Sequence, residues 1–298
     1  MKGIRRQRQL RNFWLFVTPA VALYSILWML PLVFNLVISF TNWNGINPLS
    51  MTKGVGIRNY KNLFQDKIFF KAIFHNFEIT LLNVIFIPAV SFLTAVAIEK
   101  SFIRKKGIFR TLLFIPAILP MLLVAILFRW VYSIDGGMIN SFLELLGMES
   151  LQRNFLGDYK TALISLFVIN LWKNYPFYMT IFLSGLQGIS KDLEEAARMD
   201  GAGYWKCIWY VILPSMKSIV TVVMGLVIID GFRVFDLVFT TTKGGPAYAT
   251  EVMGTLIYRI AFSDSRLGYA TAMSTINVIV VLFISFLYFK LSSDSDKR

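Results

Sequence analysis

Apolar runs of twenty or more residues recur along the whole of this 298-residue chain, and they leave few folds open to it. A helix of that length crosses about 30 Å of hydrocarbon. The composition agrees, because 56% of the residues are hydrophobic and only 16% are charged, against about 25% in an ordinary soluble domain. The chain is therefore predicted to be an all-α, polytopic membrane protein.

Six of these runs are predicted to span the membrane. The first is about twice as long as the apolar part of a cleaved signal peptide, so we expect it to stay in the membrane, with kinks at Pro19 and Pro31. The predicted spans cover about residues 12–40, 72–98, 108–133, 161–187, 212–239 and 271–290. They predict one transmembrane domain, residues 13–290, between tails at 1–12 and 291–298.

Basic residues set the expected orientation of these spans. Lys and Arg are dense before the first span, in the short loops after the second and fourth, and after the sixth, which is typical of cytoplasmic segments. The formal charge of +13 therefore indicates a lipid surface rather than nucleic acid. Both termini are predicted to be cytoplasmic. Residues 53–71 carry five basic residues on the predicted outside, and we interpret them as an amphipathic segment on the membrane surface.

The chain lacks the motifs that most enzymes and metalloproteins need. Cys207 is its single cysteine and His75 its single histidine, which excludes an internal disulfide and a zinc-type cluster. It has no G-x-x-x-x-G-K-[ST] phosphate-binding loop and no G-x-S-x-G nucleophile motif. We expect a transport or structural protein with no catalytic residue, no metal and no cofactor.

A polar stretch, "LEEAARMDGAGYWKCIWYVILPS", lies between the fourth and fifth predicted spans. Ser190 is a candidate N-cap, Gly201 and Gly203 are turn signals, and Pro214 ends the second of two predicted short helices. One helical face is formed by Leu193, Ala196, Ala197 and Asp200. This pattern fits either a solvated loop or a short helix that docks into a groove on a partner.

The segment "EAARMDGAGYWKCIWYVILP" resembles the cytoplasmic EAA loop of binding-protein-dependent ABC importer permeases. In that family the loop is the coupling helix that docks on the ATPase subunit. The matching residues are Glu195, Ala196, Ala197, Asp200, Gly201, Ala202, Leu213 and Pro214. The resemblance makes residues 188–214 the expected coupling loop, although Ile208, Trp209, Tyr210 and Val211 depart from the family's usual residues.

Three more segments resemble the maltose-type carbohydrate permeases: "VGIRNYKNLFQD", "DLVFTTTKGGPAYATEVMGTLIYRIAF" and "GYATAMSTI". The resemblance implies the type I ABC importer permease fold in the cytoplasmic membrane of a bacterium or archaeon. It also implies a second permease subunit, two ABC ATPase subunits and an extracytoplasmic sugar-binding protein as partners. Gly244, Gly245 and Pro246 are expected to form an outer gate turn, although any exposed hairpin uses such a turn.

Polar residues within two spans are candidates for the substrate path, because ionisable groups in a span face the bundle interior by default. Asp230, Arg233 and Asp236 share one side of the fifth span, where they either neutralise one another or meet sugar hydroxyls. In the fourth span the candidates are Asn170, Trp172, Asn174, Tyr175 and Tyr178. Aromatic rings beside amides suit a carbohydrate, but they also form interfacial belts.

The favoured function is therefore that of an ABC importer permease for a di- or oligosaccharide. A gradient-driven secondary transporter is the first alternative, with Asp230 and Asp236 as proton carriers. A non-transporting membrane scaffold is the second. Among ABC permeases, glycerol phosphate compounds and polyols remain alternative cargoes.

Overall fold

The computed structural model describes residues 2–100 and 105–295, and the basic residue Arg104 and the end of the predicted C-terminal tail lie outside these ranges. The described part is almost entirely helical, and its one β-bridge pairs Thr41 with Gly54. The chain divides into two compact units, which are residues 1–66 with 257–277 and residues 67–256 with 278–298.

The first unit contains α1 (Lys2–Tyr24), α2 (Leu30–Ile38), α3 (Arg58–Leu63) and the beginning of α15 (Leu267–Ser295). The side-chain amide of Asn59 donates to the carbonyls of Ser39 and Thr41, each at 2.8 Å, and so holds the loop after α2. The Gly268 N–H donates to the carbonyl of Trp43 at 2.7 Å. These bonds satisfy the irregular backbone of the loop.

Two π-helical turns end two residues before a proline. Ser25–Met29 precedes Pro31, and Ile208–Ile212 precedes Pro214. Proline has no N–H to donate and its ring crowds the preceding turn, so the helix widens locally instead of closing its usual hydrogen bonds. The predicted effect of Pro31 thus takes the form of a π turn, whereas Pro19 lies inside α1.

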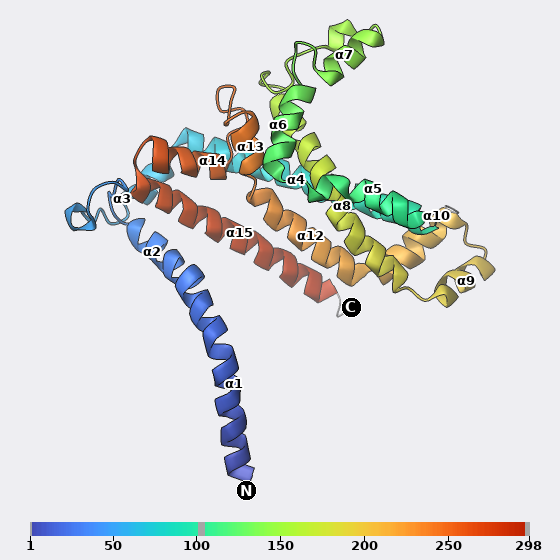
Figure 1. Cartoon of the computed structure of the whole chain (residues 1–298), viewed down its shortest axis with the longest axis horizontal. Coiled ribbons are helices and arrows are strands. Elements are labelled where there is room, and N and C mark those ends of the chain that lie inside the picture. Colours follow the sequence, from blue (N-terminus) through green and yellow to red (C-terminus); the bar gives the residue numbers. More distant parts are fainter. Residues whose placement is uncertain (1, 101–104, 296–298) are drawn as a thin grey trace. The chain divides into compact units, whose positions relative to one another are not determined.

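The second unit is built around three helices that pack on one another, namely α4 (Lys67–Lys100), α8 (Ala162–Gln187) and α12 (Lys217–Phe232) (Figure 1). The other elements of this unit are α5 (Lys106–Ile118), α6 (Met121–Val131), α7 (Met138–Leu145), α9 (Lys191–Met199), α10 (Tyr204–Cys207), α11 (Leu213–Ser215), α13 (Asp236–Thr241) and most of α14 (Met253–Tyr258). The 3₁₀ turn Glu149–Leu151 also belongs to this unit, whereas the 3₁₀ turn Leu49–Met51 and the π turn Arg259–Ser263 belong to the first.

Close packing, rather than escape from water, holds helices together in lipid. The core of the second unit contains Phe92, Tyr178, Phe182 and Val223, all buried. Small residues let the helices approach one another. A Cβ added at Gly231 of α12 would lie 2.9 Å from the Cα of Thr80 on α4, which is closer than side chains pack.

All six predicted spans are helical, but they differ in how they could cross a membrane. By length and composition, Phe13–Ile38, Lys67–Lys100 and Leu267–Ser292 qualify as single helices. Two bent pairs raise the total to five: α5 with α6, bent by 93°, and Tyr204–Ser215 with Lys217–Thr241, bent by 76°. The remaining predicted span is α8, whose 26 residues are long enough. Its middle, around Lys173, is too polar to qualify by composition.

Three details of the prediction are wrong. The fifth span, predicted over 212–239, is interrupted at Met216 and again between Phe232 and Asp236. The third span, predicted as continuous over 108–133, breaks at Leu119 and Pro120, both of which are extended. The reason is that the residue before a proline avoids the helical conformation. The segment 53–71 is not one amphipathic element either, because α3 ends at Leu63 and α4 begins at Lys67, with Phe69 buried.

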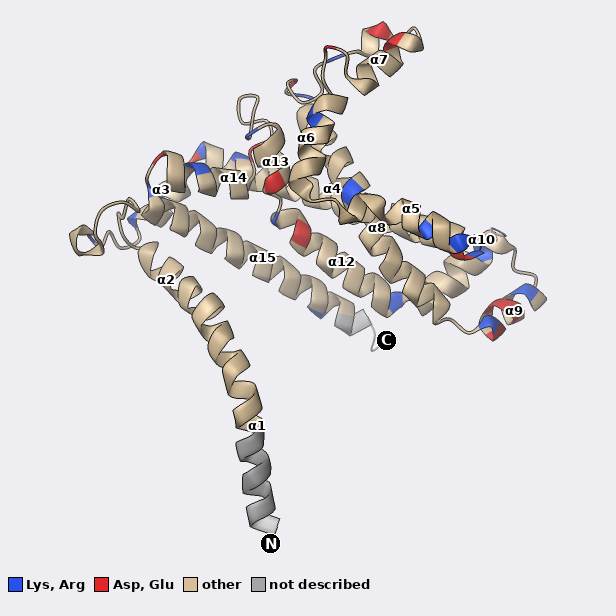
Figure 2. Cartoon of the chain, viewed as in Figure 1, with Lys and Arg blue, Asp and Glu red and all other residues tan. Residues whose placement is uncertain are grey.

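Charged residues concentrate near the helix ends and in the loops (Figure 2). The middle of α15 carries none from Leu267 to Phe289. Lys173, in the middle of α8, is an exception within the second unit. Polar groups that enter the apolar part of this unit therefore mark the region where a site is to be sought.

We expect Gly231→Ala to lower the stability of the protein. The new methyl group would force α12 away from Thr80, at a cost of about 1–3 kcal/mol for an overpacked contact. Thermal unfolding in detergent measures the effect. Gly107→Ala is the matched control, because a Cβ there meets nothing within 4 Å. Equal stability of the two variants would contradict the close packing of α4 and α12.

Candidate functional site

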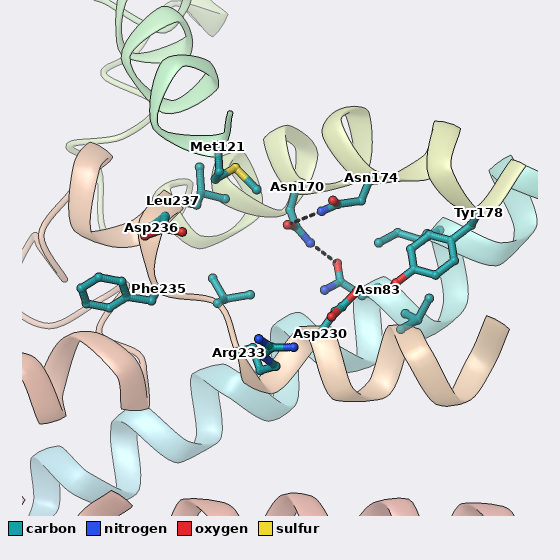
Figure 3. A pocket seen from close by; sticks show the side chains of 13 residues that line it. Asn83, Met121, Asn170, Asn174, Tyr178, Asp230, Arg233, Phe235, Asp236 and Leu237 are labelled. Carbon is teal, nitrogen blue, oxygen red and sulfur yellow. Dashed lines mark hydrogen bonds between the residues drawn. The ribbon is translucent and has the colours of Figure 1, made fainter. Parts of the chain in front are cut away.

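A pocket of about 300 Å³ lies in the second unit, among α4, α8, α12, α13 and the first residue of α6 (Figure 3). Most of its polar lining comes from α8 and from the segment that runs from the end of α12 to the start of α13. The lining residues are Asn83, Ile87, Met121, Asn170, Asn174, Tyr178, Val227, Asp230, Arg233, Val234, Phe235, Asp236 and Leu237.

Three asparagines form a hydrogen-bonded row along one wall of the pocket (Figure 3). The amide of Asn170 donates to Oδ1 of Asn83 at 3.0 Å, and the amide of Asn174 donates to Oδ1 of Asn170 at 2.8 Å. Asn83 and Asn170 are buried, so each needs these bonds to offset the loss of water. These hydrogen bonds fix the orientation of the amide groups. Asn174, which is less buried than the other two, lies at the pocket.

Asp230 is held by a tyrosine. The Tyr178 hydroxyl donates to Oδ2 of Asp230 at 2.6 Å, and Tyr178 itself is buried (Figure 3). Within the described part of the chain, no ion pair joins Asp230 to Arg233, and the hydrogen bond to Asp230 comes from Tyr178 instead. Tyr178 lies on a different helix, and no pattern local to the fifth span could have revealed it.

Two of the three charged residues of the pocket, Arg233 and Asp236, sit where helix dipoles favour them. Arg233 is the C-cap of α12, where the negative end of the dipole attracts a cation. Asp236 is the first residue of α13, where the positive end attracts an anion. Asp230, Arg233 and Asp236 are all exposed, so their heads are available to a solute in the pocket.

Six of the eight residues predicted for the substrate path line this pocket, and two do not. The ring of Trp172 packs at 5.3 Å between centroids against Phe128, on α6. Tyr175 accepts a hydrogen bond from Ser91 through its backbone carbonyl, at 2.8 Å. The cause is helix periodicity, because positions 170, 174 and 178 share one face while 172 and 175 point elsewhere. Asn83 was not predicted, although an asparagine inside an apolar span was a signal.

The polar stretch after α8 forms the predicted helix, turn and helix. The Ser190 hydroxyl accepts from the Asp192 N–H at 3.2 Å, which confirms the predicted N-cap of α9. After α9, Gly201 has φ +82°, and the Ala202 N–H donates to the Ala197 carbonyl at 2.9 Å. Glycine adopts this φ without strain, so Gly201 is the residue that turns the chain.

Most of the residues matched to the EAA loop are accessible. Glu195, Ala196, Asp200, Gly201 and Pro214 are exposed, and no residue of α9 is fully buried. The others, Ala197, Ala202 and Leu213, are half-buried. Ala197 and Leu213 pack against the hydrophobic core of their own unit. The predicted docking face is therefore only partly free, and Ala196 is its most clearly open alanine.

Side-chain contacts tie α9 and the end of α8 to the end of α4. Lys100, the last residue of α4, forms an ion pair with Glu194 of α9, and both side chains are largely buried, at 18% and 14% exposure. The Gln187 amide donates to Oε2 of Glu99 at 3.3 Å. Because Asn83 lies on the same α4, one helix connects the pocket with the segment that resembles a coupling loop.

The residues of the predicted gate turn form a tight loop. The Gly245 N–H donates to the Thr242 carbonyl at 2.9 Å, and the Thr250 hydroxyl donates to the Gly245 carbonyl at 2.6 Å. Gly244 has φ +85° and lies against the Glu251 carboxylate, which leaves no room for a larger residue. The Gly245–Pro246 peptide bond is cis.

Comparison with known proteins shows which family the chain resembles. The family model described as "Binding-protein-dependent transport system inner membrane component" matches residues 87–294. A multiple sugar-binding transport system permease protein of Streptococcus mutans is 33% identical over 94% of this chain and 94% of its own length. A probable ABC transporter permease protein of Bacillus subtilis is 30% identical over 93% of the chain and 94% of its own length.

A solved structure has the same fold. It is a chain of a bacterial alginate ABC transporter in complex with an alginate pentasaccharide-bound periplasmic protein. The TM-score is 0.84 at 23% sequence identity, over 98% of this chain and 96% of the other.

We expect Asn83→Leu to destabilise the second unit. It removes the acceptor of the buried Asn170 amide, and an unsatisfied buried donor costs about 1–3 kcal/mol. Thermal unfolding in detergent is again the measurement. Asn277→Leu is the control, because Oδ1 of Asn277 is buried without a hydrogen-bond partner in the described part of the chain. A larger loss of stability in the control would contradict the importance of the asparagine row.

Proposed function

The chain belongs to the family of binding-protein-dependent transport system inner membrane components, and from this premise we propose that it imports a di- or oligosaccharide as the permease subunit of an ABC transporter. Membership makes the chain a transport component of an inner membrane. The observation that carries the proposal is the pocket beside the asparagine row, with its exposed charged residues on α12 and α13.

The lining of the pocket supports a carbohydrate as cargo. A sugar presents hydroxyl groups that both donate and accept hydrogen bonds, and the pocket offers amides, carboxylates and one guanidinium around an otherwise apolar wall. The name of the Streptococcus relative refers to multiple sugars, and the structural neighbour carries alginate, which agrees with this class of cargo.

The transporter also needs partners. We propose a second permease subunit across the pocket, two ABC ATPase subunits on the cytoplasmic side and a sugar-binding protein on the outer side. This arrangement places both termini and α9 in the cytoplasm and the turn at 244–246 outside. The dense basic residues around α9 and at the end of α4 support the orientation.

In the proposed cycle, the chain alternates between two states. ATP binding draws the ATPase subunits together and moves α9, which docks on one of them. The Lys100–Glu194 pair passes this movement to α4, and α4 carries Asn83 at the pocket. The asparagine row and Asp230 then exchange hydrogen bonds with the sugar as the pocket opens to the other side.

Purification and reconstitution test the proposal. The chain, isolated from its native membrane, should bring a second permease and an ABC ATPase with it. In liposomes with the binding protein, the complex should take up a maltooligosaccharide only when ATP is present inside. Uptake by this chain alone, driven by an ion gradient without ATP, would overturn the proposal in favour of a secondary transporter.

We expect Ala196→Trp to weaken binding of the ATPase subunit by about tenfold or more, because a large ring on an exposed docking face separates the two surfaces. Affinity of the purified permease pair for the ATPase is the measurement. Lys160→Trp is the control, an equally bulky change at an exposed position before α8. Normal binding by the Ala196 variant would refute docking through this face.

Charge reversal tests the link between α9 and α4. Glu194→Lys alone should reduce ATP-driven uptake about fivefold, since contacting residues typically couple by roughly 1 kcal/mol, while the ATPase still binds. Adding Lys100→Glu should restore uptake. Lys191→Glu, on the exposed side of the same helix, is the control and should have little effect. Failure of the double variant to recover would rule out coupling through this ion pair.

A further inference from the structure

The sharpest bend in the described chain within a predicted span lies between α5 and α6, at 93°. The carbonyl of Ala117, in the last turn of α5, has lost the amide four residues on, because Leu119 and Pro120 are extended. In lipid no water replaces a lost donor, so this end of the helix needs a partner from the protein.

Lys173 supplies that partner. Its Nζ donates to the Ala117 carbonyl at 3.0 Å, from the middle of α8. A lysine ammonium at a helix C-terminus also meets the negative end of the helix dipole. These two interactions explain why α8 carries a cation in a region where one is costly. The side chain caps the broken helix, and Lys173 does not line the pocket.

Trp172, the residue before Lys173, contacts α6, the helix on the other side of the bend. The Trp172 ring lies edge-on to Phe128 of α6, with 5.3 Å between centroids and 62° between planes. Phe128 in turn packs on Tyr132, a buried residue just after α6. Two consecutive residues of α8 thus contact the two helices on either side of one break, Lys173 at α5 and Trp172 at α6.

The bend matters to the pocket because Met121, the first residue of α6, forms part of its wall (Figure 3). Helix α6 also packs against α13, whose first two residues, Asp236 and Leu237, line the same pocket. A change in the angle between α5 and α6 would therefore move one wall relative to the asparagine row on α4 and α8.

We propose that Lys173 and Trp172 are positioning residues, which fix the α5–α6 bend and so set the shape of the sugar pocket without touching the sugar. The geometric part stands independently, and the part that concerns sugar uptake rests on the proposed function. The two residues clamp the bend from α8, so that movement of α8 in the transport cycle carries Met121 with it.

Spin labels measure the bend directly. In a Cys207→Ser background, cysteines replace Leu112 on α5 and Leu127 on α6, both exposed, and the complex is studied in nanodiscs by pulsed EPR. We expect one narrow distance distribution with Lys173, a shifted or broadened one in Lys173→Met, and recovery in Lys173→Arg, which keeps the cation. Lys160→Met is the control for loss of a positive charge. Trp172→Ala should also broaden the distribution, and Trp172→Phe less so.

Uptake by the reconstituted complex gives the second measurement. Lys173→Met should raise the KM for the sugar by about tenfold, the usual scale for losing a hydrogen bond to a charged group, and Lys173→Arg should restore it. A raised KM with an unchanged distance would overturn the proposal, because Lys173 would then act on the sugar itself. An unchanged distance with normal uptake would overturn it as well. If Lys173→Met shifts the distance but the unsubstituted complex takes up no sugar, the proposed function is refuted and the positioning of the bend by Lys173 still stands.

Discussion

A polar group that this chain carries into the bilayer is costly unless it finds a hydrogen-bond partner inside the protein. That constraint accounts for much of the second unit. Asn83, Asn170 and Asn174 satisfy one another in a row, Tyr178 meets Asp230, and Lys173 meets a carbonyl that a proline break has left free. Each bond joins groups that would be costly to leave alone in lipid.

The same helix, α8, supplies a member of all these interactions. One of its faces carries Asn170, Asn174 and Tyr178 toward the pocket, and the residues between them reach α5 and α6. The polar residues in the middle of α8 therefore give this helix a lower hydropathy than the other predicted membrane spans. A helix that lines an internal path can carry polar residues, because it contacts other helices and a solute rather than lipid.

The sequence predicted more of the local structure than of the contacts. The Ser190 cap and the glycine turn after α9 follow from residue-level conformational preferences, and the structure has both of them. The break predicted at Leu213 and Pro214 is wrong in its place, because the helix continues through both residues and ends at Ser215. The break at Pro120 follows from the same rule and was missed, because the apolar run continues through it without a change in hydropathy.

Long-range pairing could not be predicted from one sequence. Tyr178 and Asp230 are 52 residues apart, and Lys173 and Ala117 are 56 apart, so no periodicity links them. The separation of the pocket residues from Trp172 and Tyr175 could have been predicted, since it requires only the helical repeat along α8. The half-burial of Ala197 depends on how α9 seats on its own unit, which is a matter of packing rather than of pattern.

The most direct test of the central claim is the side from which the pocket can be reached. Asn174→Cys, in a Cys207→Ser background, places a thiol at the asparagine row, and a membrane-impermeant thiol reagent is applied from either side of the reconstituted complex. We predict labelling from the cytoplasmic side without nucleotide and from the outer side with a non-hydrolysable ATP analogue. Labelling from the same side in both states, or from neither, would contradict a role of this pocket in the transport path.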